Sequence, residues 1–232
     1  MLDEAYFYFK LMWLFVCVIS FLLLLLCYLY FGKQRAHKNE YESFTFSHQV
    51  IKGMEMERRR ISRDLHDIVL PQVHGMPVSE QIRTICTELI PPDFSRLSLN
   101  DLLADICNKF AKRTGIDCSY FFENNFLFET INAENRLHIY RIVQECFTNI
   151  EKHSKAKKAM LIAKRHNGNI LICVSDDGIG LNSNDESGFG MNSIKQRAAI
   201  VGANTDFISE SQNGLMVRIE IVTLPNLLKG GE

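Results

Sequence analysis

The spacing of hydrophobic positions changes several times along the chain, and the first change marks a long apolar run. No charge occurs between Leu11 and Phe31, about 21 residues that as a helix would span roughly 31 Å, the thickness of a bilayer core. Aromatic residues border the run, and Lys33, Arg35 and Lys38 follow it. The positive-inside rule therefore predicts one transmembrane helix over 11–31, with 1–10 outside the cytoplasm. A cleaved signal peptide is the alternative, disfavoured by the acidic start and the lack of an A-x-A site.

The segment after this run is charged, with apolar residues at heptad-like spacing. These are Ile51, Met54, Ile61, Leu65 and Ile68, with Arg58 at the remaining seam position. Such a row predicts a helix that pairs with a second copy of itself. Gly75-Met76-Pro77 interrupts the helix, Val78–Leu89 resumes it, and Pro91-Pro92 ends it. We therefore expect a signalling helix or linker over 33–54 and a dimerising helical hairpin over 55–92.

The remaining pattern alternates between helical and strand periodicity. Ser98 and Asp101 form a capping-box pair for a helix that ends at Gly115, and Asn132 or a residue nearby caps a largely apolar helix to about Lys152. Two Asn-Gly turns, at 167–168 and 213–214, favour hairpins. Strands are expected at Ile116–Phe122, Ala159–Arg165, Asn169–Asp176, Thr205–Glu210 and Leu215–Val222, with a helix at Asn192–Val201. The fold class is therefore α+β, with a two-layer α/β sandwich over 98–224.

Charge and cysteine content narrow the class of protein. The formal net charge is −1 and both signs are interspersed, so no basic surface indicates nucleic-acid binding. The seven cysteines have no C-x-x-C spacing, which is typical of small core residues in a reducing compartment.

The first candidate for chemistry is His66, in the segment Arg63-Asp64-Leu65-His66-Asp67. If Leu65 lies on the pairing seam, His66 lies one step round the helix and faces solvent. A neutral imidazole is a nucleophile near pH 7, and Asp67 can hold its other ring N–H, fixing the tautomer. An incidental histidine on a solvated helix is the alternative.

A second candidate lies near the end of the long helix. Glu145 and Asn149 are four residues apart and share one helix face, with Lys152 and His153 one turn on. An amide oxygen can bind Mg²⁺, and the basic pair can meet phosphate oxygens. Ordinary polar chemistry at a helix end is the alternative.

Two glycine loops complete the set. Asp176, Gly178 and Gly180 follow an apolar strand, where a carboxylate can accept a hydrogen bond from an exocyclic amine. Gly188-Phe189-Gly190-Met191 leads into a helix whose first amides favour phosphate. Either loop alone is a common turn, so the information lies in the order and spacing of all four segments.

In series, these segments resemble the boxes of bacterial two-component sensor histidine kinases, in the subfamily with an R-D-L-H-D phosphorylation box and a GHKL-type (Bergerat) ATP-binding domain. The resemblance covers about residues 55–223. It implies that His66 is the phosphoacceptor with Asp67 as its polarising neighbour, and that Glu145 is a base or positions water. It also implies Mg²⁺ binding by Asn149, an adenine contact from Asp176, and ATP binding by Asn149, Lys152, His153, Asp176, Gly178, Gly180, Gly188, Gly190 and Met191.

The same resemblance implies a homodimer in the bacterial cytoplasmic membrane that autophosphorylates with Mg-ATP. The phosphoryl group would pass to a response regulator with a LuxR-type DNA-binding output. Family members carry glutamine four residues after the box aspartate, where this chain has Pro71 followed by Gln72, which leaves phosphatase activity open. The hairpin is short, so we expect dimerisation to depend on the membrane span and the 33–65 helix.

Two other functions stay open at this point. One is a different enzyme on the same ATP-binding fold, such as a serine-directed anti-sigma kinase or a GHKL ATPase, which would not need an exposed histidine on a paired helix. The other is a membrane-tethered dimerisation scaffold without turnover. Nothing in the sequence assigns the signal that is sensed or the cognate regulator.

Overall fold

The computed structural model describes residues 2–124, 127–181, 188–209 and 214–222, and it divides into two units. The boundary falls between Lys52 and Gly53, inside helix α1 (Leu2–Asp64). The first unit is the N-terminal part of this helix. Its segment Lys10–Arg35 is long and apolar enough to cross a membrane, and large apolar side chains from Leu11 to Phe31 are exposed. No loop separates the predicted span from the predicted 33–54 linker, since α1 is continuous.

The second unit begins with a helical hairpin, made by the end of α1 and three short segments. These are the π-helical turn η1 (Leu65–Val69), helix α2 (Leu70–Gln72) and the returning helix α3 (Val78–Leu89). The turn between them contains Gly75 at φ +85°, a backbone conformation that favours glycine. The hydroxyl of Ser62 donates to the carbonyl of Cys86 at 3.0 Å. The returning helix therefore passes the level of the predicted phosphoacceptor His66.

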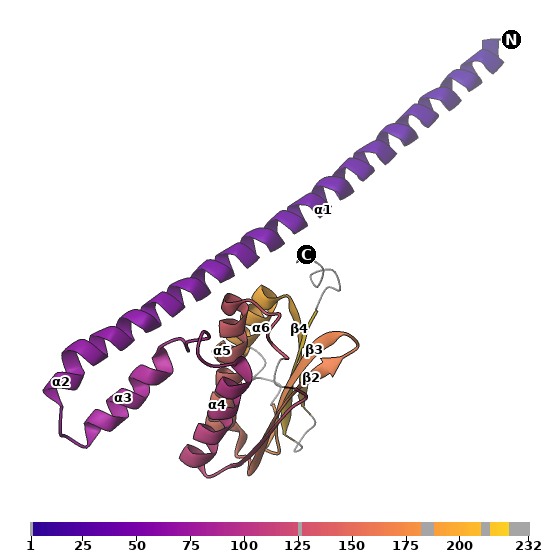
Figure 1. Cartoon of the computed structure of the whole chain (residues 1–232). Helices are drawn as coiled ribbons and strands as arrows, with labels where there is room; N and C mark the ends of the chain where they lie inside the picture. Colours follow the sequence, from indigo (N-terminus) through magenta and orange to yellow (C-terminus); the bar gives the residue numbers. More distant parts are fainter. Residues whose placement is uncertain (1, 125–126, 182–187, 210–213, 223–232) are drawn as a thin grey trace, which may run out of the picture. The chain divides into compact units, whose positions relative to one another are not determined.

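The rest of the second unit is a five-stranded mixed sheet covered on one face by helices (Figure 1). The sheet order is β1-β2-β3-β5-β4; β1 and β2 are parallel and the other neighbours antiparallel. The strands are β1 (Asp117–Phe122), β2 (Lys158–His166), β3 (Asn169–Asp176), β4 (Ala203–Ser209) and β5 (Leu215–Ile221). The helices are α4 (Leu99–Thr114), α5 (Ala133–Asn149), the π-helical turn η2 (Ile150–Ser154) and α6 (Phe189–Val201). We call this part the α/β layer.

Alternate residues of the central strands form the core of the α/β layer. Ile170, Ile172 and Val174 of β3 are buried toward the helices, as the period of two along a strand requires. From the helices, Phe110 and Phe147 meet with ring centroids 4.9 Å apart and are both buried. Burial of such side chains contributes roughly 1.5–3 kcal/mol each. This core fixes the helices that carry the candidate site.

The helix caps expected from the sequence are present. The Asp101 amide donates to Ser98 Oγ at 3.1 Å, and the Ser98 amide donates back to Asp101 Oδ2 at 3.3 Å. Asn132 caps α5 by accepting from the Asn135 amide at 2.8 Å. Gly115 ends α4 at positive φ as expected, and Gly202, which the sequence analysis did not name, ends α6 in the same way. Local sequence therefore sets these helix boundaries.

One helix boundary was predicted wrongly. The sequence placed the start of the last helix at Asn192, whereas α6 begins at Phe189. Gly188 is its N-cap, with φ −59° and ψ 147°, so Gly190 and Met191 belong to the first helical turn and not to a preceding loop. Gly188 suits this position because an N-cap residue is not yet helical. Asn213, in the predicted turn at 213–214, lies outside the described residues. Glu210, the expected last residue of a strand, lies outside them as well.

Candidate functional site

A cavity of about 650 Å³ opens between α5, η2, the end of β3 and the start of α6. Its volume lies within the range of small-molecule sites. Nine of the residues predicted for chemistry line it: Glu145, Asn149, Lys152, His153, Asp176, Gly180, Gly188, Gly190 and Met191. Apolar side chains, among them Val174, Leu215 and Val217, complete the wall. The residues predicted from three separate stretches of the sequence, 145–153, 176–180 and 188–191, therefore meet at one site.

Glu145 and Asn149 face the first turn of α6 from α5. A Cβ added at Gly190 would lie 2.5 Å from Glu145 Oε1 and 3.0 Å from Asn149 Oδ1. Because Gly190 has no side chain, the side-chain oxygens of Glu145 and Asn149 can approach the backbone of α6 closely. Both side chains are partly buried, so their oxygens are held in the wall of the cavity.

The π-helical turn η2 brings Lys152 and His153 to the cavity. Ser154 ends this turn and is buried; its hydroxyl donates to the Ile150 carbonyl at 2.8 Å and accepts from the Ala156 amide at 3.0 Å. The Ser154 carbonyl then accepts from the Ile179 amide at 2.9 Å. Ser154 therefore ties the basic turn to the loop after β3. The sequence analysis did not single it out, because a serine at a helix end carries no distinctive signal.

Asp176 lies half-buried at the end of β3 and lines the cavity. Burial raises the pKa of its carboxyl group, and nearby Asp177 raises it further, while backbone hydrogen bonds from Gly178 and Leu215 oppose the shift. The Gly178 amide donates to Asp176 Oδ1 at 2.8 Å. The carboxylate is thus pre-oriented by backbone and held in an apolar wall, an arrangement suited to accept from a polar ligand group.

The neighbouring Asp177 has a structural role in holding the backbone. Its Oδ1 accepts from the amides of Lys157 and Lys158, both at 2.8 Å. These backbone hydrogen bonds lower the pKa of the Asp177 carboxyl group. Asp177 does not line the cavity and instead fixes the start of β2 against the loop. The two adjacent aspartates therefore differ in their contacts: Asp176, the last residue of β3, lines the cavity, and Asp177, the next residue, binds the backbone of Lys157 and Lys158.

Two glycines hold the loop after β3 in place. Gly178 is buried and does not line the cavity; a Cβ there would collide with the Ser154 carbonyl oxygen. Gly214, at φ +80°, packs against the backbone carbonyl of Asp176, where a Cβ would also collide. Of the predicted ligand-binding residues, Gly178 is thus the one that supports the wall without forming it.

His66 and Asp67 form a separate group on the hairpin. Nδ1 of His66 lies 2.8 Å from Oδ1 of Asp67, and their side chains are 66% and 70% exposed. Both residues belong to the π-helical turn η1, a rare conformation that is frequent at functional sites. Neither residue lines the 650 Å³ cavity. The structure therefore confirms the expected exposure of His66 and its contact with Asp67, and leaves both apart from the other nine residues.

The chain is similar to sensor histidine kinases in sequence. It is 24% identical over 201 residues to the sensor histidine kinase LiaS of Bacillus subtilis, a match over 73% of this chain and 55% of that protein. It is 24% identical over 204 residues to the oxygen sensor histidine kinase NreB of Staphylococcus carnosus, covering 75% of this chain and 58% of that protein. The chain thus spans little more than half the length of these relatives. No family model matches it.

A solved structure gives the fold. The histidine kinase domain of a blue-light-activated histidine kinase of Erythrobacter litoralis aligns with a TM-score of 0.50 at 17% identity, over 72% of this chain and 93% of that one. Helices followed by a mixed five-stranded sheet are common to both, so the expected fold class is confirmed. The chain is a distant relative of sensor histidine kinases, with the fold of a histidine kinase domain.

Proposed function

We propose that this chain is a membrane-anchored sensor histidine kinase of a two-component system. It phosphorylates its own His66 with Mg-ATP and passes the phosphoryl group to an aspartate of a response regulator. The observation that carries this proposal is the convergence of nine predicted residues on one cavity, beside a hairpin that exposes His66 in contact with Asp67. A serine kinase or ATPase on the same fold has no use for the second feature.

In this proposal the cavity holds the nucleotide. Asp176 accepts a hydrogen bond from the adenine amine, and the apolar wall packs against the flat ring. Lys152 and the first amides of α6 meet the phosphates, since a helix N-terminus favours negative charge. Gly188, Gly190 and Met191, with Phe189 exposed beside them, border this end of the cavity.

The residues between α5 and α6 fit Mg²⁺. Asn149 Oδ1 and Glu145 Oε1 lie close to the same point beside Gly190, and amide and carboxylate oxygens are the hard ligands that this ion takes. Asn149 would bind the ion directly, with Glu145 ordering water or a proton beside it. When bound, the ion neutralises charge on the phosphate oxygens.

The transfer step uses the two ring nitrogens of His66 differently. Asp67 holds Nδ1–H, so Nε2 carries the lone pair that attacks the γ-phosphorus. The N–P bond forms as the bond from phosphorus to the bridging oxygen breaks, and ADP leaves with that electron pair. The regulator's aspartate then attacks the phosphorus and returns the imidazole to its starting state. Positioning and electrostatics supply most of the rate enhancement in such transfers.

The assembly is also proposed from exposed apolar surface. The side chains of the 11–31 segment would face lipid, with residues 1–10 outside and 33–54 linking the span to the hairpin at 55–92. Ile61 and Ile68 are exposed on the hairpin within one chain, as a seam for a second copy would be. The soluble part, including the ATP-binding domain at 98–224, then lies in the cytoplasm of a bacterial cell. We propose a homodimer and a regulator with LuxR-type output as partners.

The test is incubation of the purified chain, in lipid nanodiscs, with Mg²⁺ and ATP labelled on the γ-phosphate. We expect label that is lost in acid and stable in alkali, as a phosphoramidate requires. His66→Gln should abolish the label and retain binding of a fluorescent ATP analogue. His74→Gln, an exposed histidine on the same hairpin, is the matched control and should label normally. Label that persists in His66→Gln would overturn the proposal.

A further inference from the structure

A buried cluster of charges joins the hairpin to the α/β layer. Glu55 of α1 is 6% exposed, and Arg141 of α5 and Arg197 of α6 are each 3% exposed. Charged side chains are almost never buried this deeply unless they are paired, because desolvation is costly. None of the three belongs to the nucleotide site or to the phosphoacceptor described above.

Glu55 meets both arginines at once. Arg197 Nη2 donates to Glu55 Oε1 at 2.8 Å, and Arg141 Nε donates to Glu55 Oε2 at 3.3 Å. The paired residues are 86 and 142 positions apart in the sequence. Each oxygen of one carboxylate thus holds one guanidinium, and each guanidinium belongs to a different helix of the α/β layer.

Arg141 also holds the second arm of the hairpin. Its Nη1 donates to the Glu88 carbonyl at 3.0 Å and its Nη2 to the Leu89 carbonyl at 2.9 Å. These carbonyls lie at the end of α3, where a helix leaves its last acceptors without intrahelical partners. One arginine therefore contacts both arms of the hairpin.

The two clamped helices are the ones that carry the nucleotide site. On α5, Glu145 follows Arg141 by one turn and Asn149 by two, while α6 starts with the cavity residues Gly190 and Met191 and reaches Arg197 two turns later. The position of Glu55 therefore sets how α5 and α6 lie against α1. His66 lies eleven residues after Glu55, in the turn η1 that continues α1.

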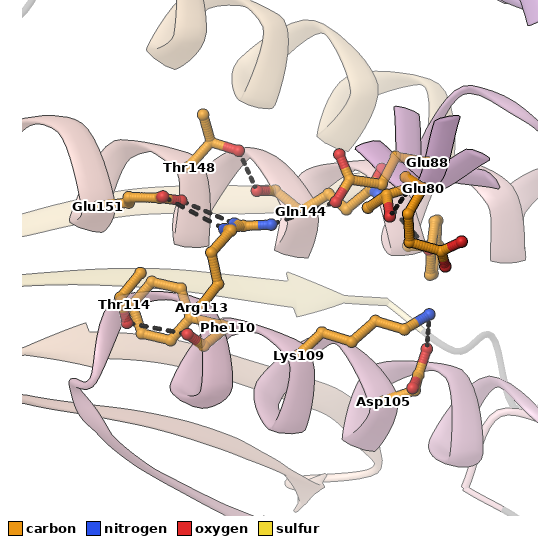
Figure 2. A network of polar contacts seen from close by, with 12 residues as sticks. Glu80, Glu88, Asp105, Lys109, Phe110, Arg113, Thr114, Gln144, Thr148 and Glu151 are labelled. Atoms are coloured by element: carbon orange, nitrogen blue, oxygen red, sulfur yellow. Dashed lines mark hydrogen bonds and ion pairs between the residues drawn. The ribbon is translucent and has the colours of Figure 1, made fainter. Parts of the chain in front are cut away.

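Beside the buried cluster, the junction is incompletely packed and is lined by both polar and apolar side chains. A second cavity of about 320 Å³ is lined by residues of α1, α3, α4, α5 and α6. Across it, Arg113 pairs with Glu88 at 3.1 Å and with Glu151 at 2.7 Å (Figure 2), and all three side chains are at least one-third exposed. Exposed pairs of this kind add little net stability. The buried cluster is then the main specific link between hairpin and α/β layer.

In this arrangement His66 lines neither cavity. In-line attack needs the nucleophile within about 3–3.5 Å of phosphorus, so for transfer within one chain the α/β layer must leave this pose before its nucleotide reaches the histidine. On the basis of the function proposed above, we propose that Glu55 is a positioning residue: it clamps α5 and α6 to α1 in a resting pose, and its release speeds phosphoryl transfer to His66. A movement of α1 could then control the kinase through one carboxylate.

The first test is the rate of phosphohistidine formation in the full chain at saturating Mg-ATP. Glu55→Gln keeps the size of the side chain and removes its charge. We expect the initial rate to rise by about threefold or more while the KM for ATP stays within about twofold, because the variant shifts the population of poses and not nucleotide contacts. Glu55→Asp, which restores the charge, should return the rate toward that of the unmodified chain.

Glu57→Gln is the matched control. Glu57 is two residues further along α1, is exposed, and pairs with Arg60 of its own helix at 2.6 Å. Its loss should leave the rate unchanged. An unchanged or lower rate in Glu55→Gln would overturn the clamp; a lower rate would mean that transfer uses the clamped pose, for example toward the histidine of a second copy.

The second test does not depend on activity. Phenylglyoxal modifies accessible arginines, and mass spectrometry locates the sites. Arg141 and Arg197 should be protected in the unmodified chain and in Glu57→Gln, and modified faster in Glu55→Gln, with binding of a fluorescent ATP analogue retained as the control for folding. Equal protection in all three would overturn the clamp. If no variant forms phosphohistidine, the proposed function fails while the arginine pattern still decides whether Glu55 holds the junction.

Discussion

The hairpin and the α/β layer differ in the kind of side chain that they bury. Among the described residues from Gly53 to Leu89, the buried side chains are Glu55, Ser62 and Cys86. The α/β layer instead buries apolar side chains from all its helices and from three of its five strands, β2, β3 and β5, in one continuous cluster. The layer can hold its shape through its own core, whereas the hairpin depends on polar contacts and on surfaces that a second copy could cover.

The largest expected difference between the regions is the cost of removing an apolar side chain. Phe147→Ala should lower the free energy of unfolding by about 3–5 kcal/mol, since the ring is fully buried against Phe110. Ile68→Ala on the hairpin should cost under about 1 kcal/mol in the monomer, since Ile68 is exposed. Urea unfolding in detergent measures both. Equal costs would contradict the contrast between the two regions.

Substitutions at two glycines separate the cost of backbone strain from an effect on nucleotide binding. Gly214→Ala should destabilise the chain by about 1–3 kcal/mol and weaken ATP binding, because φ is +80° and a Cβ would strike the backbone of Asp176. Gly168→Ala is the control: φ is +83° but the space around it is open. It should share the strain and leave nucleotide affinity unchanged. Calorimetric titration with ATP would show whether the two variants differ.

A helix cap should have a smaller effect. Ser98→Ala removes the capping box of α4 and should cost about 1 kcal/mol. Thr84→Ala, on the hairpin, loses only a bond from its hydroxyl to the Glu80 carbonyl within the same helix, so it should be nearly neutral. Thermal unfolding of the two variants compares them. A larger loss for Thr84→Ala would mean that the hairpin carries more of the stability than its burial indicates.

The smallest effect is a pH dependence of nucleotide binding. The pKa of Asp176 is raised above 3.8, chiefly by burial, so its carboxylate takes up a proton at a higher pH than an exposed aspartate does. Affinity for ATP should fall as pH drops through that raised pKa, and Asp176→Asn should remove this dependence. For stability the sign is opposite: burying the charge costs free energy above the raised pKa, so stability rises as pH falls through it. An affinity for ATP that does not change with pH in the unmodified chain would contradict the proposed contact between Asp176 and the nucleotide.

Much of the fold followed from local rules. Capping residues, an Asn-Gly turn and strand alternation gave the order of elements, and three of the four spaced motifs gave nine residues that meet in one cavity. The early start of α6 and the π-helical turns η1 and η2 were not predictable, because such turns depend on tertiary contacts more than on residue propensity. The tasks of Ser154, Asp177 and Glu55 were missed for a related reason: each depends on a partner distant in the sequence.

In the proposed function each region has one part of the reaction: the α/β layer binds the nucleotide and the hairpin receives the phosphoryl group. The most direct measurement is the position of the phosphoryl group, mapped by mass spectrometry at neutral pH after the chain is incubated with Mg-ATP. The predicted result is one phosphoryl group on the peptide that contains His66, with fragment ions placing it on the imidazole. A phosphoryl group on another residue, or none on a chain that binds ATP, would contradict the account.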